Sequence, residues 1–218
     1  MNIHLIAIGG SAMHNLALEL HKKGYQVTGS DDEIFEPSKS RLEAAGLLPE
    51  KWGWYPERIT SRLDAVILGM HAREDDPELQ KAQELGIPIY SYPEYLYEQT
   101  KNKLRVIVGG SHGKTTTTSM ISQILLAAKK DPTITVGGIL KAIDGNLRVG
   151  KSDVFISEAC EYTNSFLNFR PKYSIILNIE AEHLDFFKDI HDIRNSFHLF
   201  AKNTKENGAI VINGEIEN

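Results

Sequence analysis

Residues 104–128 of the chain read LRVIVGGSHGKTTTTSMISQILLAA, and this stretch decides the fold. The apolar run Leu104–Val108 predicts a strand, and a Gly-rich turn follows it directly. Beyond the turn, apolar residues at helical spacing fall along one face of a predicted helix: Met120, Ile121, Ile124, Leu125 and Ala128. A strand, a glycine turn and a helix in this order indicate a parallel α/β sheet that carries a phosphate-binding loop.

The turn has the chemistry of a phosphate loop. Gly110 and Gly113 let backbone N–H groups approach phosphate oxygens, and the helix N-terminus adds partial positive charge. Lys114 can reach the β- and γ-phosphates of ATP, and Thr115 is placed to ligate Mg²⁺. The motif is the shorter G-x-x-G-K-T form, because Val108 stands where the eight-residue motif has its first Gly. The predicted ATP-binding residues are Gly110, Ser111, His112, Gly113, Lys114, Thr115 and Thr116.

Two further predicted strands end in polar residues that suit the same site. Glu158 follows the strand 153–157, and the segment 178–185, which contains His183, follows the strand 173–177. Ligands of parallel sheets bind at the carboxyl ends of the strands, and hard cations prefer oxygen ligands. Glu158 is therefore a candidate Mg²⁺ ligand, with an ordinary solvated glutamate as the alternative. An isolated histidine is more often an ordinary surface or core residue than a ligand. Because three strand ends converge here, a role in the site is favoured for His183.

Apolar runs alternate with segments of helical period along the chain, which predicts parallel strands covered by helices on both faces. The polar segment 97–103 divides the chain into a predicted first domain, residues 1–102, and a second domain, residues 103–218. The predicted strands are 3–8, 26–30, 65–70 and 87–91 in the first domain, and 104–108, 154–157, 173–177 and 209–212 in the second. Because the second sheet ends on a strand and a turn, we expect that domain to be incomplete.

Composition excludes several classes of function. The 24 Lys and Arg residues against 29 Asp and Glu residues give a formal net charge of −5, so no general basic field exists for nucleic acid or an anionic membrane. The single cysteine cannot form an internal disulfide, and the N-terminus lacks the order of a secretion signal. No apolar stretch reaches the roughly 18 residues of a membrane span. We therefore expect a cytosolic protein without membrane insertion.

Three segments together resemble the central domain of the Mur ligases: residues 110–117 (GSHGKTTT), 158–167 (EACEYTNSFL) and 178–185 (NIEAEHLD). The resemblance covers nearly the whole chain and implies a bacterial, cytoplasmic, ATP-dependent ligase of peptidoglycan synthesis that uses ATP and Mg²⁺. It implies that ATP phosphorylates the lactyl carboxylate of UDP-N-acetylmuramate, and that an amine then attacks the acyl phosphate. By motif position it implies catalytic roles for Lys114 on the phosphates, for Glu158 between two metals and for His183 on the second metal, with Thr115 on the first.

The first domain resembles the Rossmann-like UDP-sugar-binding domain of the same family. A Gly-Gly turn stands before the first helix, where the helix N-terminus suits a diphosphate, and a carboxylate at the second strand end suits a sugar or base hydroxyl. Ser11 and His14 occupy places where the dinucleotide fingerprint has small glycines, which disfavours NAD. The predicted UDP-sugar residues are Gly9, Gly10, Ser11, Ala12, Met13, Ser30, Asp31, His71 and Arg73. For Arg73, a merely solvated side chain is an equal alternative.

The amino substrate stays open at this point. The second half of the chain resembles family members that add L-alanine, whereas residues 69–79 resemble members that attach a ready-made tripeptide during recycling. A third reading is a module that holds UDP-sugar and Mg-ATP without turnover. In the family, the amino-substrate site and the closing lid lie in a third domain that this sequence lacks, so we expect the chain alone to bind without ligating.

Several residues of types that often occur in active sites are given a structural role or no role. Cys160 stands beside a candidate metal ligand, but without an assigned base it is interpreted as a small packed residue. His198 is assigned to a helix that packs on the sheet, and Trp52 and Trp54 receive no role. An unrelated P-loop phosphotransferase is disfavoured, because it would not need the segments around Glu158 and His183.

Overall fold

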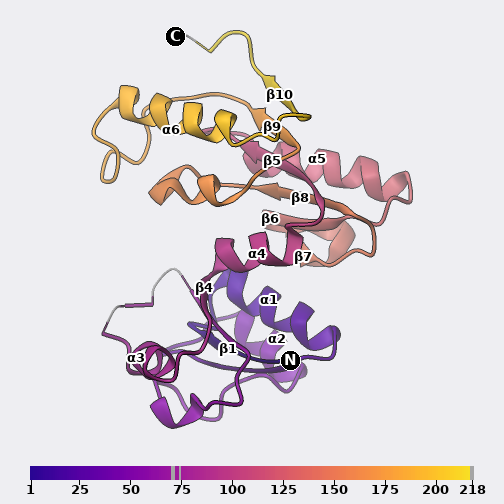
Figure 1. Cartoon of the computed structure of the whole chain (residues 1–218). Coiled ribbons are helices and arrows are strands. Elements are labelled where there is room, and N and C mark those ends of the chain that lie inside the picture. The colour runs from indigo at the N-terminus through magenta and orange to yellow at the C-terminus, as the bar shows by residue number, and fades with distance from the viewer. Residues whose placement is uncertain (70–71, 74, 217–218) are drawn as a thin grey trace. The chain divides into compact units, whose positions relative to one another are not determined.

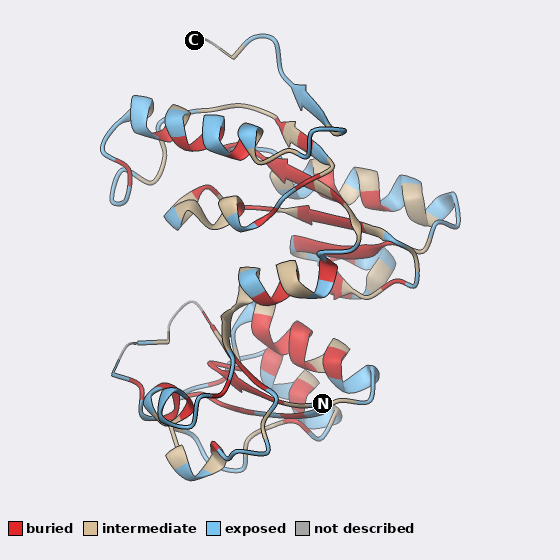
Figure 2. Ribbon diagram, in the orientation of Figure 1, coloured by how far each residue is buried: buried red, intermediate tan, exposed pale blue. Residues whose placement is uncertain are grey.

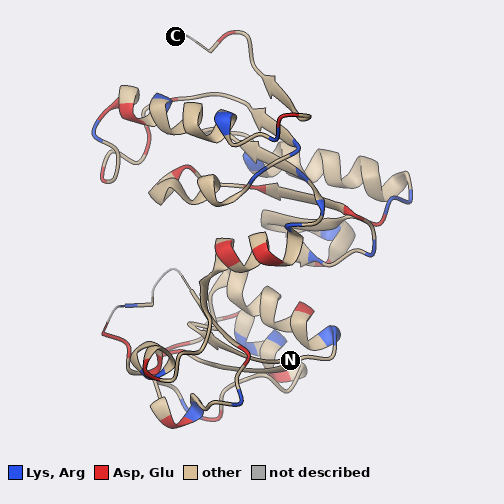
Figure 3. Ribbon diagram, viewed as in Figure 1, with Lys and Arg blue, Asp and Glu red and all other residues tan. Residues whose placement is uncertain are grey.

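The computed structural model describes residues 1–69, 72–73 and 75–216 (Figure 1). The chain divides into two compact units, Met1–Tyr95 and Leu96–Asn218. Each unit has its own mainly parallel sheet, as the alternation of apolar runs and helical segments predicts. Basic and acidic residues are interspersed along both units (Figure 3). None of the helices in the described ranges is long and apolar enough to cross a membrane.

The first unit is built on a parallel four-stranded sheet in the order β2-β1-β3-β4. Its strands are β1 (Asn2–Ile6), β2 (Gln26–Ser30), β3 (Ala65–Leu68) and β4 (Ile89–Ser91). Its helices are α1 (Ser11–Lys22), α2 (Ser38–Ala44), the short 3₁₀ turn η1 (Pro56–Arg58) and α3 (Pro77–Glu84), and the division between the units falls within α4 (Tyr92–Thr100). Helix α1 leads from β1 to β2 and α3 leads in the opposite direction from β3 to β4, so right-handed crossovers place them on opposite faces.

Apolar spacing explains how this sheet is covered. Helix α1 buries residues at helical intervals, namely Met13, Leu16, Ala17 and Leu20, while strands β1 and β3 bury nearly all their side chains (Figure 2). Helix α3 begins where its sequence requires, because the carboxylate of Asp76 accepts hydrogen bonds from the N–H groups of Glu78 and Leu79 at 2.8 and 3.0 Å. Pro77 occupies the first helical position, where its missing N–H costs nothing.

A buried polar network joins strands β1 and β2 to helix α3 in the first unit. Glu78 of α3 is fully buried, and its carboxylate accepts hydrogen bonds from Ser30 Oγ at 2.6 Å and from Tyr55 N at 2.7 Å. The imidazole of His4, also fully buried, lies 3.1 Å from the same carboxylate. Burial alone would raise the pKa of Glu78, but the hydrogen bonds from His4, Ser30 and Tyr55 lower it below its ordinary value. The ionised carboxylate therefore stabilises this unit.

The second unit is built on a six-stranded sheet in the order β10-β9-β5-β8-β6-β7, in which only β7 runs antiparallel. Its strands are β5 (Leu104–Gly109), β6 (Thr133–Leu140), β7 (Gly145–Arg148), β8 (Val154–Glu158), β9 (Tyr173–Ile176) and β10 (Ala209–Ile212). Its helices are α5 (Lys114–Ala127), α6 (Ile190–Lys202) and the 3₁₀ segments η2 (Lys141–Ile143) and η3 (Tyr162–Asn168). Helices α5 and α6 lead in opposite directions along the sheet, so they cover opposite faces.

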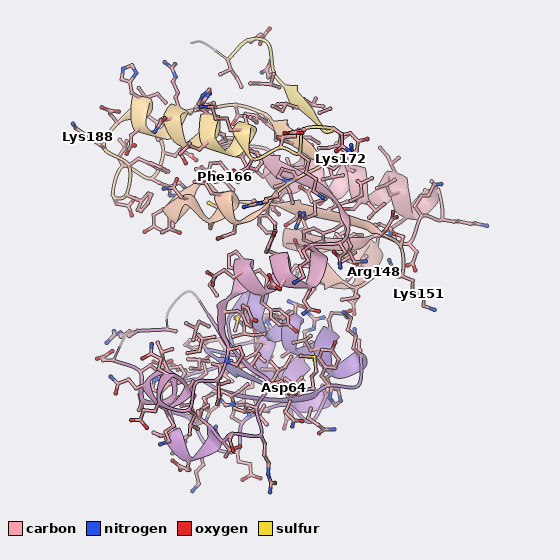
Figure 4. The ribbon with its side chains drawn as sticks, viewed as in Figure 1. Asp64, Arg148, Lys151, Phe166, Lys172 and Lys188 are labelled. Atoms are coloured by element: carbon pink, nitrogen blue, oxygen red, sulfur yellow. The ribbon has the colours of Figure 1, made fainter. Side chains whose placement is uncertain are left out.

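The two helices of this unit pack in different ways. Helix α6 presents Phe197 and Phe200 to Phe166 of η3, with ring centroids 5.1 and 4.8 Å apart, and Figure 4 shows Phe166 beside α6. Helix α5 instead buries the small polar residues Thr118 and Ser122. Its apolar Met120 and Ile124, on the face that the sequence indicates, are 61% and 65% exposed. A small-residue face lets α5 approach the sheet closely.

Most predicted elements lie where the sequence places them, and two departures concern the second unit. The hairpin β6–β7 has no counterpart among the predicted strands, because the glycines at 137 and 138 interrupt the apolar pattern of β6 and β7 has only four residues. The first part of the polar segment 97–103 is the end of helix α4, with Leu96 buried, so a polar composition here does not mark an extended linker.

We predict that Glu78→Gln lowers the free energy of unfolding of the first unit by about 1–3 kcal/mol near pH 7, because a buried hydrogen-bonded charge is lost. The folded-state pKa of Glu78 is lowered, so its stabilisation is present above the unfolded-state pKa of about 4.3 and is lost as the pH falls through the folded-state value. The difference between wild type and variant should therefore shrink in acid. Both tryptophans, Trp52 and Trp54, lie in this unit, so urea unfolding followed by tryptophan fluorescence measures it selectively.

Glu84→Gln is the matched control. Glu84 stands on the same helix, but its carboxylate pairs with Lys81 at the surface, with a side chain 66% exposed. Its substitution should change the unfolding free energy by less than about 0.5 kcal/mol. Equal effects of the two substitutions, or a difference that grows in acid, would contradict the role given to Glu78.

Candidate functional site

The phosphate loop lies between β5 and α5 and has the backbone that glycine permits. Gly110 and Gly113 have φ of +140° and +80°, values that side-chain-bearing residues rarely adopt. The loop is held by the segment after β9: the N–H of Ser111 donates to Asn178 O at 3.2 Å, and the N–H of His112 donates to Asn178 Oδ1 at 2.8 Å. Asn178 therefore shapes the loop through both its backbone and its side chain.

Lys114, the first residue of α5, curls back over this loop. Its ammonium group donates to the carbonyl oxygens of Gly110 and Ser111 and lies 3.3 Å from Glu161 Oε2. The lysine side chain is 16% exposed and that of Glu161 only 1%, so the pair lies largely out of solvent. This arrangement holds the positive charge where a phosphate group on the loop would meet it.

Thr115 and Glu158 meet at the neighbouring strand end. Thr115 Oγ1 donates to Glu158 Oε2 at 2.8 Å, and the N–H of Gly137 in β6 donates to the other carboxylate oxygen. A side chain at position 137 would be obstructed, because its Cβ would lie 2.9 Å from Glu158 Oε1. The unpredicted strand β6 thus orients the carboxylate. A hydroxyl and a carboxylate oxygen side by side are the donors that Mg²⁺ prefers.

His183 has a different set of neighbours from those that the sequence indicates. Its Nε2 lies 3.7 Å from Glu161 Oε1 and 4.0 Å from Cys160 Sγ, and the ring of Tyr162 packs at 4.9 Å from its own. No interaction between His183 and Glu158 is found among the described residues. The predicted metal-binding residues therefore form two groups, Thr115 with Glu158, and His183 with Cys160 and Glu161.

Glu161 is a candidate functional residue that the sequence analysis did not single out. It lies in the loop between β8 and η3, is 1% exposed, and connects Lys114 to His183 through its two carboxylate oxygens. The sequence signal was a second glutamate three residues after Glu158. Its neighbour Cys160 is half-buried, and burial raises the pKa of this thiol, with the adjacent Glu161 carboxylate adding to the rise.

The remaining predicted ATP-binding residues lie along the same loop. His112 is exposed, with its Nε2 3.3 Å from Glu180 and 3.5 Å from Glu182 carboxylate oxygens. Ser111 is buried, and its Oγ accepts a hydrogen bond from the N–H of Glu180 at 2.8 Å. Thr116 is exposed in the first turn of α5. His198 is exposed on α6 and takes no part in this group.

In the first unit, a cavity of about 400 Å³ opens at the carboxyl ends of the strands. Its lining comes from the loops after β1, β2 and β3 together with one aromatic residue: Ala7, Asp31, Asp32, Trp54, Arg73, Asp75, Asp76 and Pro77. The connection after β1 leads to one edge of the sheet and the connection after β3 leads to the other. Open α/β sheets bind ligands at the carboxyl ends of the strands where the connections diverge in this way. Trp54, which received no role in the sequence analysis, is part of this wall.

The predicted UDP-sugar residues separate into two groups. Gly9 and Asp31 are joined, because the N–H of Gly9 donates to Asp31 Oδ2 at 2.7 Å, and burial raises the pKa of this carboxyl group. Gly10 precedes α1, where no side chain caps the helix, and Ser11 is exposed and Ala12 partly exposed in its first turn. Met13 and Ser30 point into the interior instead, and the Ser30 hydroxyl is engaged by Glu78. His71 lies outside the described residues.

Two family models match the chain along nearly its whole length. Residues 2–103 match the model described as the Mur ligase family, catalytic domain, and residues 108–218 match the Mur ligase middle domain. The first match ends at residue 103 and the second begins at residue 108, so the division between them falls in strand β5.

Individual relatives agree with these matches. The UDP-N-acetylmuramate–L-alanine ligases of Agathobacter rectalis and Lachnospira eligens are 55% and 46% identical to the chain across all of it. The chain spans about half the length of these curated relatives, 47% of each.

Two solved structures are similar over 99% of the chain. The UDP-N-acetylmuramate:L-alanyl-γ-D-glutamyl-meso-diaminopimelate ligase of Neisseria meningitides has a TM-score of 0.87 at 29% identity, with 72% of that chain covered. The UDP-N-acetylmuramate–alanine ligase of Thermotoga maritima has a TM-score of 0.82 at 30% identity, with 50% of that chain covered. On the combined evidence of its phosphate loop, its two sheets and these matches, the chain belongs to the Mur ligase family.

Proposed function

We propose that this chain is the UDP-sugar- and ATP-binding part of a cytoplasmic ligase that joins L-alanine to the lactyl carboxylate of UDP-N-acetylmuramate in peptidoglycan synthesis. The observation that carries the proposal is the loop 110–115, with Lys114 folded over it beside Glu161 and with Thr115 beside Glu158. The names of the relatives that cover the whole chain at 46–55% identity support L-alanine as the amino substrate.

A ligase for a ready-made peptide is the second candidate. The structural similarity to the Neisseria enzyme, whose name includes a tripeptide, favours it, and so does the sequence of residues 69–79. The identity to that enzyme is 29%, lower than to the alanine ligases. L-Alanine is therefore the preferred proposal.

The chemistry of the proposed reaction is mostly electrostatic. A γ-phosphate bound on the loop would meet the backbone N–H groups at the start of α5 and the ammonium group of Lys114. Glu161 positions that ammonium group before the nucleotide arrives. When the phosphoryl group moves to the lactyl carboxylate, the negative charge on its oxygens is met by groups that are already oriented, which lowers the barrier.

The residues around Glu158 fit Mg²⁺. Thr115 and Glu158 offer two oxygen donors 2.8 Å apart, and Gly137 fixes the carboxylate from behind. Bound there, Mg²⁺ would neutralise charge on the β- and γ-phosphate oxygens. A role of His183 on a second Mg²⁺ stays a prediction, because the neighbours of His183 include a sulfur atom, which Mg²⁺ does not favour.

The sugar nucleotide is assigned to the first unit. The uncapped N-terminus of α1 after Gly10 offers N–H groups to a diphosphate. The adjacent cavity, rich in carboxylates, suits the hydroxyl and N–H donors of a ribose, sugar or base. Arg73 is the basic side chain of the cavity lining and can meet an anionic part of the ligand.

We predict that Lys114→Ala weakens Mg-ATP binding about 10- to 100-fold, because a charge-assisted contact to phosphate is lost. Isothermal titration calorimetry on the folded variant measures the change. Lys130→Ala is the control, since Lys130 is exposed just beyond the far end of α5 and should leave affinity unchanged. Unchanged ATP affinity in folded Lys114→Ala would show that the loop does not bind the phosphates as proposed.

We predict that saturation-transfer NMR detects binding of UDP-N-acetylmuramate and not of NAD. Arg73→Ala should weaken UDP-N-acetylmuramate binding by about tenfold or more, through loss of a charged hydrogen bond. Arg62→Ala, exposed elsewhere in the same unit, is the matched control. Transfer to NAD with none to the UDP-sugar would exclude a UDP-sugar site in this unit.

Ligation itself should depend on the part of the relatives that this chain does not span. We predict no detectable product from the 218-residue chain with ATP, UDP-N-acetylmuramate and L-alanine, because a positioned amine and an enclosed acyl phosphate are both needed. A protein extended to the length of the relatives should form the L-alanine product faster than the tripeptide product. Mass spectrometry and phosphate release measure both reactions, and ligation by the 218-residue chain alone would contradict the proposal.

A further inference from the structure

Cys160, Glu161 and His183 form a compact group of metal-ligand atoms that the proposed ATP chemistry does not use as a set. One ligand atom from each residue lies within 4.8 Å of the other two. The measured separations are 4.0 Å from Cys160 Sγ to His183 Nε2 and 3.7 Å from His183 Nε2 to Glu161 Oε1. Cys160 and Glu161 come from the loop after β8, and His183 comes from the segment after β9.

The carboxylate of Glu161 gives an independent indication that something is bound here. Its Oε2 interacts with Lys114, but its Oε1 is buried and has no hydrogen-bond partner among the described residues. The side chain is 1% exposed, so solvent does not satisfy this oxygen. A buried carboxylate oxygen without a partner is costly and uncommon in native proteins. Oε1 lies 3.7 Å from His183 Nε2, in the group that also contains Cys160, where a bound cation would satisfy it.

The chemistry of the three donors selects the class of cation. A thiol sulfur and an imidazole nitrogen favour Zn²⁺ and similar transition metals over Mg²⁺ or Ca²⁺, which prefer oxygen ligands. With Zn–S near about 2.3 Å and Zn–N near about 2.0 Å, the sulfur and nitrogen of a tetrahedral site lie roughly 3.5 Å apart. The observed separation of 4.0 Å needs only a small inward movement of the side chains.

We propose that Cys160, Glu161 and His183 form a transition-metal site that binds Zn²⁺, with the fourth position open to water or another ligand. Glu161 gives Oε1 to the metal and keeps Oε2 for Lys114. The ring of Tyr162, packed at 4.9 Å from that of His183, restricts the orientation of the imidazole, and the Tyr162 hydroxyl is held by Asp185 at 3.1 Å. The site stands on these contacts and does not depend on the ligase reaction.

The test is a calorimetric titration of the reduced 218-residue chain with Zn²⁺ in a large excess of Mg²⁺. We expect one equivalent of Zn²⁺ to bind. Cys160→Ser and Glu161→Gln should each weaken binding at least about tenfold, as loss of a metal-site contact does. His198→Gln removes an exposed histidine of α6 as a control for adventitious surface binding, and it should leave the affinity unchanged.

Co²⁺ provides a second readout that does not depend on a variant. Cys160 is the only cysteine of the chain, so a thiolate-to-Co²⁺ charge-transfer band in the wild type identifies its sulfur as a ligand. Zn²⁺ should abolish this band by displacement. Absence of the band, or Zn²⁺ binding that folded Cys160→Ser and Glu161→Gln leave unchanged, would overturn the proposal. Should either variant fail to fold by circular dichroism, the wild-type Co²⁺ spectrum decides.

Discussion

The parallel pairing of β5 with both β8 and β9 is the constraint on which the second unit depends. Because all three strands run in one direction, the segments that follow them emerge at one edge of the sheet. Three segments therefore meet at this edge: the phosphate loop, residues 158–161 and residues 178–183. Asn178 then fixes the loop by three hydrogen bonds to Ser111 and His112.

The charges at this edge are organised around buried Glu161. A carboxylate so far from solvent is stable only when its oxygens are satisfied. Lys114 satisfies one oxygen, and the other faces His183. Lys114 and His183 both lie beside this one side chain, while Thr115 and Glu158 form a separate oxygen pair. The oxygen pair of Thr115 and Glu158 and the group around Cys160 and His183 are thus two separate sets of side chains at this edge.

Sequence reasoning was most effective where a residue type has one physical explanation. Gly110 and Gly113 take positive φ and Lys114 begins the helix, as the phosphate-loop pattern requires. Glu161 could not be found in this way, because a loop has no periodicity and glutamate is usually exposed. The hairpin β6–β7 was also missed, since its stability comes from pairing with distant strands and not from its own pattern. The contact of Ser30 with buried Glu78 was also not foreseen, because no sequence pattern indicates that Glu78 is buried beside it.

Gly137 shows how a residue without a side chain can control a functional group. Its N–H holds one oxygen of Glu158, and any side chain there would collide with that carboxylate. Substitution even by alanine would displace Glu158 while leaving every charged residue in place. In a saturation-mutagenesis screen, substitutions at position 137 would therefore act through the position of Glu158, although residue 137 itself carries no reacting group.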